Sequence, residues 1–262
     1  MRLTVLGSSA SFAGPGQACS GYLVEEGGAR LLIDAGNGTL SNAAAVTDVT
    51  HLDAAFVSHT HVDHFLDLFA LQAALRFAPS GPVGSMPLYL PEGLWARMLA
   101  LLPEHGAQQL REAFQAHTIA DGETLKFGPL TVTAHAVDHD GPTFAFTVDG
   151  EAGRLVYTAD TRIGAAARAA AQGADVLLAE CTFEMRYAGR GPHMTPAEAA
   201  GLAAESGASL LVLTHIWPTA DREQLLADAR SAFDGEVLLA EELLTVNIDP
   251  IEEAKSEDDL TS

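Results

Sequence analysis

Short apolar runs alternate along this chain with polar turns and with longer segments that carry apolar residues at helical spacing. Runs that are bounded by glycine, asparagine or aspartate predict buried strands, and the longer segments predict helices. In the first half the pattern predicts strands at 2–6, 21–25, 30–33, 54–58 and 86–90, and helices from 39, over 65–76, over 92–102 and over 107–116. In the second half it predicts strands at 123–127, 130–137, 143–148, 154–157, 176–179, 210–213 and 236–240, and helices over 163–172, 196–205 and 222–233.

Both halves of the chain begin with strands and finish with strand–helix units. This order predicts an α/β fold in which two β-sheets lie between layers of helices. No internal repeat with the period of a solenoid is present. We expect residues 1–248 to form a single domain, and we expect the acidic tail 249–262 to be disordered.

Composition and charge narrow the class of protein. Hydrophobic residues make up 48% of the 262 positions, which is enough to bury a sizeable core. No apolar run approaches the roughly 20 residues that span a bilayer, and no signal peptide precedes the first strand, so a cytoplasmic protein without membrane contact is expected. The net charge of -21 and the absence of any cluster among the 14 Lys and Arg residues disfavour long nucleic acids as partners. Cys19 and Cys181 lack metal-type spacing, and free thiols are expected.

The candidate chemistry is concentrated in residues 59–64, which directly follow the predicted strand 54–58 and precede a predicted helix. Loops of this kind are the usual place for ligands in α/β proteins. His59 and His61 are two positions apart, so extended backbone points both imidazoles to the same side, whereas Asp63 and His64 lie beyond the bend. One short loop can therefore supply two ligands to each of two neighbouring metal ions.

A site for two metals needs further ligands from other strand ends, and His139, Asp160 and His215 each follow a predicted strand. The two oxygens of a carboxylate suit Asp160 to bridge the metals. The predicted arrangement is His59, His61 and His139 at one metal, Asp63, His64 and His215 at the other, and Asp160 between them. Nitrogen and oxygen ligands without cysteine suit zinc, manganese or iron.

Two positions near this set have alternatives. His135 is a rival to His139, but it lies within the predicted strand 130–137 rather than beyond it. Asp34 either caps the helix that is predicted from residue 39 or accepts a hydrogen bond from the second ring nitrogen of a ligand histidine.

Five features, taken in order, resemble the metallo-β-lactamase fold hydrolases, and among them the phosphodiesterase branch that includes ribonuclease Z and atypical cyclic-nucleotide phosphodiesterases. The features are residues 32–36, residues 59–64, His139 ahead of residues 141–146, residues 157–161 and residues 213–215. The resemblance implies a four-layer αββα sandwich with the metals at one edge between the sheets. Ala159 departs from the relatives, which often have glycine there, and the long basic arm of many ribonuclease Z proteins has no counterpart.

The resemblance also implies that His193 lies near the substrate phosphate, with a histidine that merely precedes a helix cap at Thr195 as the alternative. Two divalent metal ions, zinc in the first instance, are expected to hold a hydroxide that attacks the phosphorus of a small phosphodiester. Asp63 would orient this nucleophile or take its proton, and His193 would donate a proton to the phosphate or to the leaving group.

The expected substrate is a cyclic nucleotide. The alternatives are a ribonuclease Z-like tRNA 3′ endonuclease and a glyoxalase II-like thioesterase. Relatives of this kind are often dimers, so the resemblance is compatible with a homodimer.

Overall fold

The computed structural model describes residues 1–79 and 82–248, so the predicted acidic tail 249–262 lies outside the described residues. Two sheets of seven strands each form the centre of the molecule. The first sheet contains β1 (Arg2–Gly7), β2 (Gly21–Glu26), β3 (Ala29–Ala35), β4 (Ala54–Phe56), β5 (Met86–Leu90), β6 (Phe114–Thr118) and β14 (Thr245–Asn247). The second sheet contains β7 (Thr124–Phe127), β8 (Leu130–Ala136), β9 (Phe144–Gly150), β10 (Gly153–Tyr157), β11 (Val176–Glu180), β12 (Leu210–Thr214) and β13 (Glu236–Leu239).

The two sheets follow the same plan. In the first sheet the order is β14-β1-β2-β3-β4-β5-β6, and in the second it is β13-β12-β11-β10-β9-β8-β7. Pairing in the first sheet is antiparallel as far as β3 and parallel from β3 to β6. Pairing in the second sheet is antiparallel from β7 to β10 and parallel from β10 to β13. The predicted order of strands followed by strand–helix units is therefore present in both halves.

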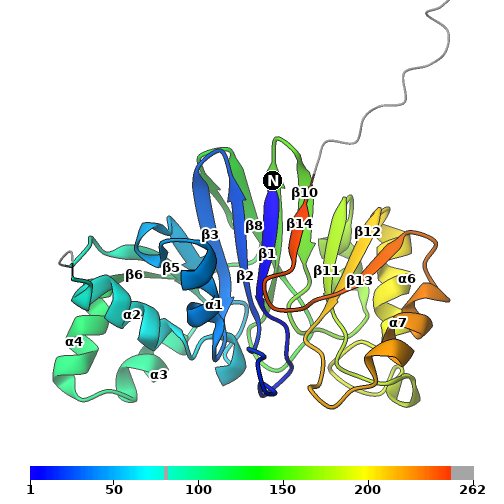
Figure 1. Ribbon diagram of the computed structural model, residues 1–262, viewed down its shortest axis with the longest axis horizontal. Coiled ribbons are helices and arrows are strands. Elements are labelled where there is room, and N and C mark those ends of the chain that lie inside the picture. Colours follow the sequence, from blue (N-terminus) through cyan, green and yellow to red (C-terminus); the bar gives the residue numbers. More distant parts are fainter. Residues whose placement is uncertain (80–81, 249–262) are drawn as a thin grey trace, which may run out of the picture.

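Helices cover the outer face of each sheet, and Figure 1 shows the resulting four layers. The helices beside the first sheet are α1 (Thr39–Val46), α2 (Leu68–Phe77), α3 (Leu94–Ala100) and α4 (Glu104–Ala113). Those beside the second sheet are α5 (Ala165–Ala171), α6 (Pro196–Ser206) and α7 (Arg222–Arg230). One apolar core lies between the sheets and one lies beneath each helical layer. The predicted αββα sandwich is confirmed.

Two edge strands were not predicted. The helix predicted over 107–116 ends at Ala113, and the next residues form β6, which pairs in parallel with β5. The segment of β6 alternates apolar and polar residues over only four positions and has a single buried residue, so its strand signal is short, and its conformation follows from pairing with β5. Strand β14 has three residues and pairs with β1, which is too short a segment for a periodic signal.

The helix predicted over 65–76 begins later, at Leu68. The three residues Val62–His64 instead form a 3₁₀ turn, and Asp63 and His64 are both buried there. A tight turn of this kind commonly precedes an α-helix, and here it directs two polar side chains inward before the helix begins. None of the helices in the described parts of the chain combines the length and the hydropathy that a bilayer span requires.

The core between the sheets depends on an aromatic group around Phe56 of β4, which is 1% exposed. Its ring lies 4.8 Å from the ring of Tyr89 in the same sheet, and 5.8 and 5.6 Å from the rings of Phe127 and Phe146 in the other sheet. These edge-to-face contacts join the two sheets directly.

We expect Phe56→Ala to lower the free energy of unfolding by about 3–5 kcal/mol, because it leaves a cavity between the sheets. Phe77→Ala is the matched control, since Phe77 is 61% exposed and its loss should change the free energy by less than about 0.5 kcal/mol. Urea unfolding followed by circular dichroism measures both. Equal effects of the two substitutions would show that the aromatic group does not hold the sheets together.

Candidate metal centre

The candidate site lies at one edge of the sandwich, where strands of both sheets end. Asp34 is the last residue but one of β3, and residues 59–64 follow β4. In the second sheet the strands β8, β10, β11 and β12 run in the same direction, because two antiparallel pairings separate β8 from β10. His139, Asp160 and His215 follow β8, β10 and β12, so the loops that carry them emerge at a common edge.

The backbone at this edge is held in an unusual conformation. Asp34, Ala159 and His215 have φ angles of 56°, 52° and 51°, in the left-handed region that residues other than glycine rarely occupy. Such residues cost about 1–3 kcal/mol each and persist only where the surroundings determine them. The left-handed backbone at Ala159 also explains why glycine suits this position.

A close approach between β3 and the histidine-rich loop requires glycine at position 36. A Cβ atom at Gly36 would lie 2.0 Å from the backbone oxygen of Asp63. Gly36, at the end of motif 32–36, therefore packs directly against the backbone of Asp63 in motif 59–64. Only glycine leaves room for the histidine-rich loop at this end of the sheet.

The structure brings all seven predicted ligands together in two groups. In each group every residue offers one ligand atom within 4.8 Å of the others. These groups are His59, His61, His139 and Asp160, and then Asp63, His64 and His215. They contain the residues that the sequence assigns to the two metal positions, with Asp160 in the first. A third group joins Asp160 and His215 to His193. His135 is outside all three groups, and its Nε2 atom lies 2.8 Å from the Thr147 hydroxyl instead.

The separations between donor atoms have the size that a metal ion would impose. In the first group His61 Nδ1 lies 3.0 Å from His59 Nε2 and 3.4 Å from His139 Nε2. In the second group His215 Nε2 lies 3.4 Å from His64 Nε2 and 3.3 Å from Asp63 Oδ2. A tetrahedral zinc ion with bonds of about 2.0–2.1 Å has ligand atoms roughly 3.3 Å apart. The donor set and its spacing therefore fit a metal ion.

Asp160 lies between the two groups. Its Oδ2 atom is 3.6 Å from His59 Nε2 and 3.9 Å from His139 Nε2, and it is 3.5 Å from His64 Nε2 and 3.3 Å from His215 Nε2. Its Oδ1 atom is buried and has no hydrogen-bond partner. A buried carboxylate oxygen without a partner is costly in a finished site, and a cation would satisfy it.

Four of the histidines are oriented by a contact at Nδ1, the ring nitrogen that does not face the cluster. The Nδ1 atoms of His59 and His64 lie 3.0 Å from Ser58 Oγ and 2.8 Å from Asp34 Oδ2, respectively. The Nδ1 atoms of His139 and His215 lie 3.3 Å from the Pro192 carbonyl oxygen and 2.7 Å from Thr182 Oγ1, respectively. Each Nε2 atom is left to face the centre of the cluster. This is the arrangement by which proteins orient histidines that bind metals.

Asp34 accepts a hydrogen bond from a ligand histidine and does not cap α1. The cap position of α1 is Gly38 and has no side-chain cap, whereas Asp34 is fully buried and accepts hydrogen bonds from four groups. Those donors are the Ser58 backbone N–H, the Ser58 hydroxyl, the Tyr157 hydroxyl and His64 Nδ1–H.

Burial and mutual charge set the protonation of the cluster. Burial, together with the neighbouring His64, lowers the pKa of His59 well below its usual value, and burial also lowers the pKa of His139. Burial opposes the charge on Asp160, but His215, His64 and His59 hold the pKa of Asp160 well below its usual value. Burial alone would lower the pKa of His64, but Asp160 and Asp34 raise it well above its usual value, so a cation would displace a proton from His64. Neutral imidazoles and ionised carboxylates are the forms that bind cations.

The sequence-predicted His193 lies beside the cluster. Its ring centroid is 5.0 Å from that of His139 and 5.6 Å from that of His215. Its Nδ1 atom is 2.9 Å from Oε1 of Glu180, which is fully buried at the end of β11. Burial alone would lower the pKa of His193, but its hydrogen bond to the Glu180 carboxylate raises the pKa above the usual value.

Sequence reasoning missed Glu180 and Thr182. Glu180 Oε1 also accepts the Thr161 N–H, and Oε2 accepts the N–H and the hydroxyl of Thr182, whose hydroxyl oxygen contacts His215. One carboxylate thus ties together the loops that follow β10, β11 and β12. The sequence does carry one sign of the role of Glu180. It is an acidic residue at the end of an apolar, fully buried strand, where an unpaired charge would be costly.

Comparisons with known proteins agree with the fold. The beta-lactamase superfamily domain matches residues 29–216. The uncharacterized protein Rv1339 of Mycobacterium tuberculosis is 34% identical over 244 residues, which are 90% of this chain and 88% of that protein. The probable metallo-hydrolase YhfI of Bacillus subtilis is 32% identical over 250 residues, or 92% of this chain and 97% of YhfI. A ribonuclease Z of Archaeoglobus fulgidus is 26% identical over 303 residues, covering 94% of this chain and 97% of the enzyme.

The crystal structure of YhfI superposes with a TM-score of 0.83 at 28% identity, and it covers 94% of this chain and 98% of YhfI. These similarities and the His/Asp cluster define a metallo-hydrolase with the metallo-β-lactamase fold. The chain belongs to the beta-lactamase superfamily.

Asp34→Asn should weaken metal binding about 10- to 100-fold, because the amide places an N–H where Asp34 now only accepts hydrogen bonds, and His64 loses its orientation. Competition with a chromophoric chelator measures the affinity. Asp53→Asn is the matched control, since Asp53 is exposed and accepts only the Arg30 N–H. An affinity of Asp34→Asn equal to that of the control would remove Asp34 from the support of the site.

Proposed function

We propose that this protein is a dinuclear metal-dependent phosphodiesterase that acts on a small nucleotide, with a cyclic nucleotide as the expected substrate. The observation that carries the proposal is the position of Asp160. One of its oxygens lies within 3.9 Å of four histidine nitrogens that belong to two groups, and the other is buried without a partner. A carboxylate placed in this way suits a pair of cations better than a single one.

The two groups of ligands would hold the two cations, and Asp160 would belong to both. Zinc is the cation that these histidine-rich sets suit best, with manganese and iron(II) as alternatives. Two divalent ions would supply Lewis acidity, which activates water and neutralises the charge of a phosphodiester.

Asp63 is suited to align the attacking water. Its Oδ2 atom accepts the Ser11 N–H at 2.8 Å and lies 3.3 Å from His215 Nε2, so the carboxylate has a fixed position. Burial opposes its charge, but the hydrogen bond to His215 and the nearby His64 keep the pKa of Asp63 below its usual value. An ionised, fixed carboxylate can orient a water molecule or accept its proton.

His193 is suited to donate a proton to the departing oxygen. Glu180 occupies its Nδ1 atom, so Nε2 is the atom that is left to face a substrate. The raised pKa of His193 favours the protonated form in which Nε2 carries a proton. A positioned imidazolium beside a phosphodiester serves as a general acid.

An aromatic cavity next to the cluster supports a nucleoside as part of the substrate. The cavity has a volume of about 320 Å³ and is lined by Thr182, Phe183, Tyr187 and Trp217 among others. Phe183 has its ring centroid 5.2 Å from that of His193, and Thr182 contacts His215. Aromatic faces of this kind bind nucleobases by stacking. The base of a nucleotide would therefore lie beside its phosphate at the metal centre.

A ribonuclease Z-like activity is the second candidate, because curated ribonucleases Z are among the relatives. The net charge of -21 argues against it, since binding of a long RNA requires neutralisation of many phosphates. A small substrate avoids this cost, because the charge of bound cations dominates at short range.

A substrate panel on metal-replete protein tests the proposal. It contains bis-p-nitrophenyl phosphate, cyclic AMP, cyclic GMP, a cyclic dinucleotide, a precursor tRNA and S-lactoylglutathione. We expect hydrolysis of the small phosphodiesters and little or none of the tRNA and the thioester. Preferential cleavage of precursor tRNA would establish the ribonuclease instead, and preferential hydrolysis of S-lactoylglutathione would establish a thioesterase.

His193→Ala should retain bound metal but lower kcat by about 10²–10⁴, the usual contribution of a general acid, with a smaller change in KM. Metal content by mass spectrometry and steady-state kinetics on bis-p-nitrophenyl phosphate measure the two quantities. His117→Ala is the control, because His117 is exposed on β6 and is outside the cluster. A kcat of His193→Ala equal to that of the control would exclude His193 from the reaction.

A further inference from the structure

A second cavity opens beside His193, on loops that follow β10 and β11. It has a volume of about 500 Å³, and its lining includes Arg162, Arg190, Pro192 and His193. The Pro192 carbonyl oxygen contacts His139 Nδ1, so the cavity borders the candidate metal centre through two neighbouring residues. We call it the arginine cavity.

The two arginines of this cavity, like the exposed Arg97, have no side-chain partner in the described residues. In the described parts of the chain, eight of the twelve arginines form ion pairs with acidic side chains. The guanidinium groups of Arg162 and Arg190 make neither an ion pair nor a hydrogen bond there, although the protein has 35 acidic residues and only 14 basic ones. Two free guanidinium groups beside the reaction centre are therefore available to a ligand.

Two acidic residues, Asp140 and Glu198, line the same cavity, but neither forms an ion pair with these arginines. Glu198 accepts the N–H and the hydroxyl of Thr195 at the start of α6, and it also accepts the Gly189 N–H. Asp140 is exposed and makes no ion pair with either arginine. The guanidinium fork matches a phosphate group in shape and charge, and it binds phosphate through two parallel hydrogen bonds.

We propose that the arginine cavity binds a second phosphate of the substrate, a terminal monoester, while the scissile phosphodiester lies at the metal centre. The inference rests on the proposed function and specifies its substrate. Two guanidinium charges match the charge of about -1.5 to -2 that a phosphate monoester carries, rather than the single charge of a diester. A short linear dinucleotide with a terminal phosphate would then fill both the metal centre and the arginine cavity, whereas a cyclic nucleotide, the substrate expected above, would fill the metal centre alone.

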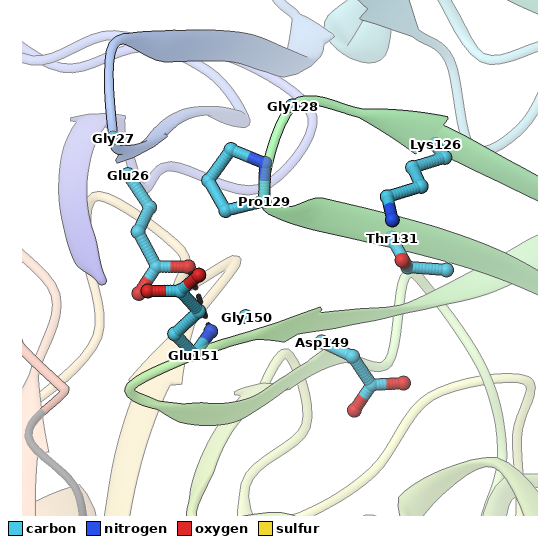
Figure 2. A pocket seen from close by; sticks show the side chains of 9 residues that line it. All are labelled: Glu26, Gly27, Lys126, Gly128, Pro129, Thr131, Asp149, Gly150 and Glu151. Atoms are coloured by element: carbon cyan, nitrogen blue, oxygen red, sulfur yellow. Dashed lines mark hydrogen bonds between the residues drawn. The ribbon is translucent and has the colours of Figure 1, made fainter.

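The cavity shown in Figure 2 has a different chemistry. It has a volume of about 740 Å³ and lies at the turns that join β2 to β3, β7 to β8 and β9 to β10. Glu26 is already satisfied there, since it lies 3.1 Å from the amino terminus and accepts the N–H groups of Glu151 and Ala152. Lys126 lines this cavity and has no ion pair in the described residues, so it provides a control far from the arginine cavity.

The test compares two dinucleotides that differ only in the terminal phosphate, pApA and ApA. Non-hydrolysable analogues with a methylene-phosphonate linkage are titrated into the metal-replete protein by calorimetry. We expect the wild type to bind the pApA analogue about 10- to 100-fold more tightly than the ApA analogue. Arg162→Gln with Arg190→Gln should reduce this ratio to near one.

Arg97→Gln with Lys126→Gln is the matched control, because it removes the same charge at two exposed residues outside the site, and it should keep the wild-type ratio. A ratio near one in the wild type, or an unchanged ratio in the arginine double variant, would overturn the proposal. Hydrolysis of bis-p-nitrophenyl phosphate by the same preparation tests the proposed function separately. Loss of that activity with a retained binding ratio would reject the phosphodiesterase and leave the phosphate subsite standing.

Discussion

The structure depends on the crowding of ionisable groups around the buried Asp160 carboxylate. Four histidine nitrogens lie within 3.9 Å of one of its oxygens, and the site is closed to water on the side of the sheets. Imidazoles that are buried side by side cannot all be protonated, and a buried carboxylate oxygen without a partner is unfavourable. A bound cation would resolve both conflicts, and the fold could then keep so many polar side chains in its interior.

The sandwich makes this crowding possible because its strand ends deliver the residues and also their supports. Asp34 at the end of β3 receives His64, Ser58 and Tyr157, and thereby joins the two sheets at the site. Glu180, at the end of β11, supports His193 in the same way, through a hydrogen bond to its ring. Left-handed backbone at Asp34, Ala159 and His215 is tolerated because these contacts determine the conformation.

The site could be predicted from the sequence where its chemistry is local. The spacing of His59, His61, Asp63 and His64 indicated two groups of ligands, and the histidines and the aspartate after later strands completed them. The supports could not be predicted, because Glu180 and Thr182 act through contacts with residues that are distant in the sequence. Edge strands β6 and β14 were missed for a related reason, since their conformation comes from pairing with β5 and β1 rather than from their own periodicity.

The most direct measurement of the central claim is anomalous X-ray diffraction from crystals of the metal-replete protein, recorded on both sides of the absorption edge of zinc. We expect two peaks about 3.5–4 Å apart, the separation found in two-metal hydrolases, with the Asp160 carboxylate between them. A single peak, or metal bound away from His59, His64 and His215, would contradict the dinuclear site.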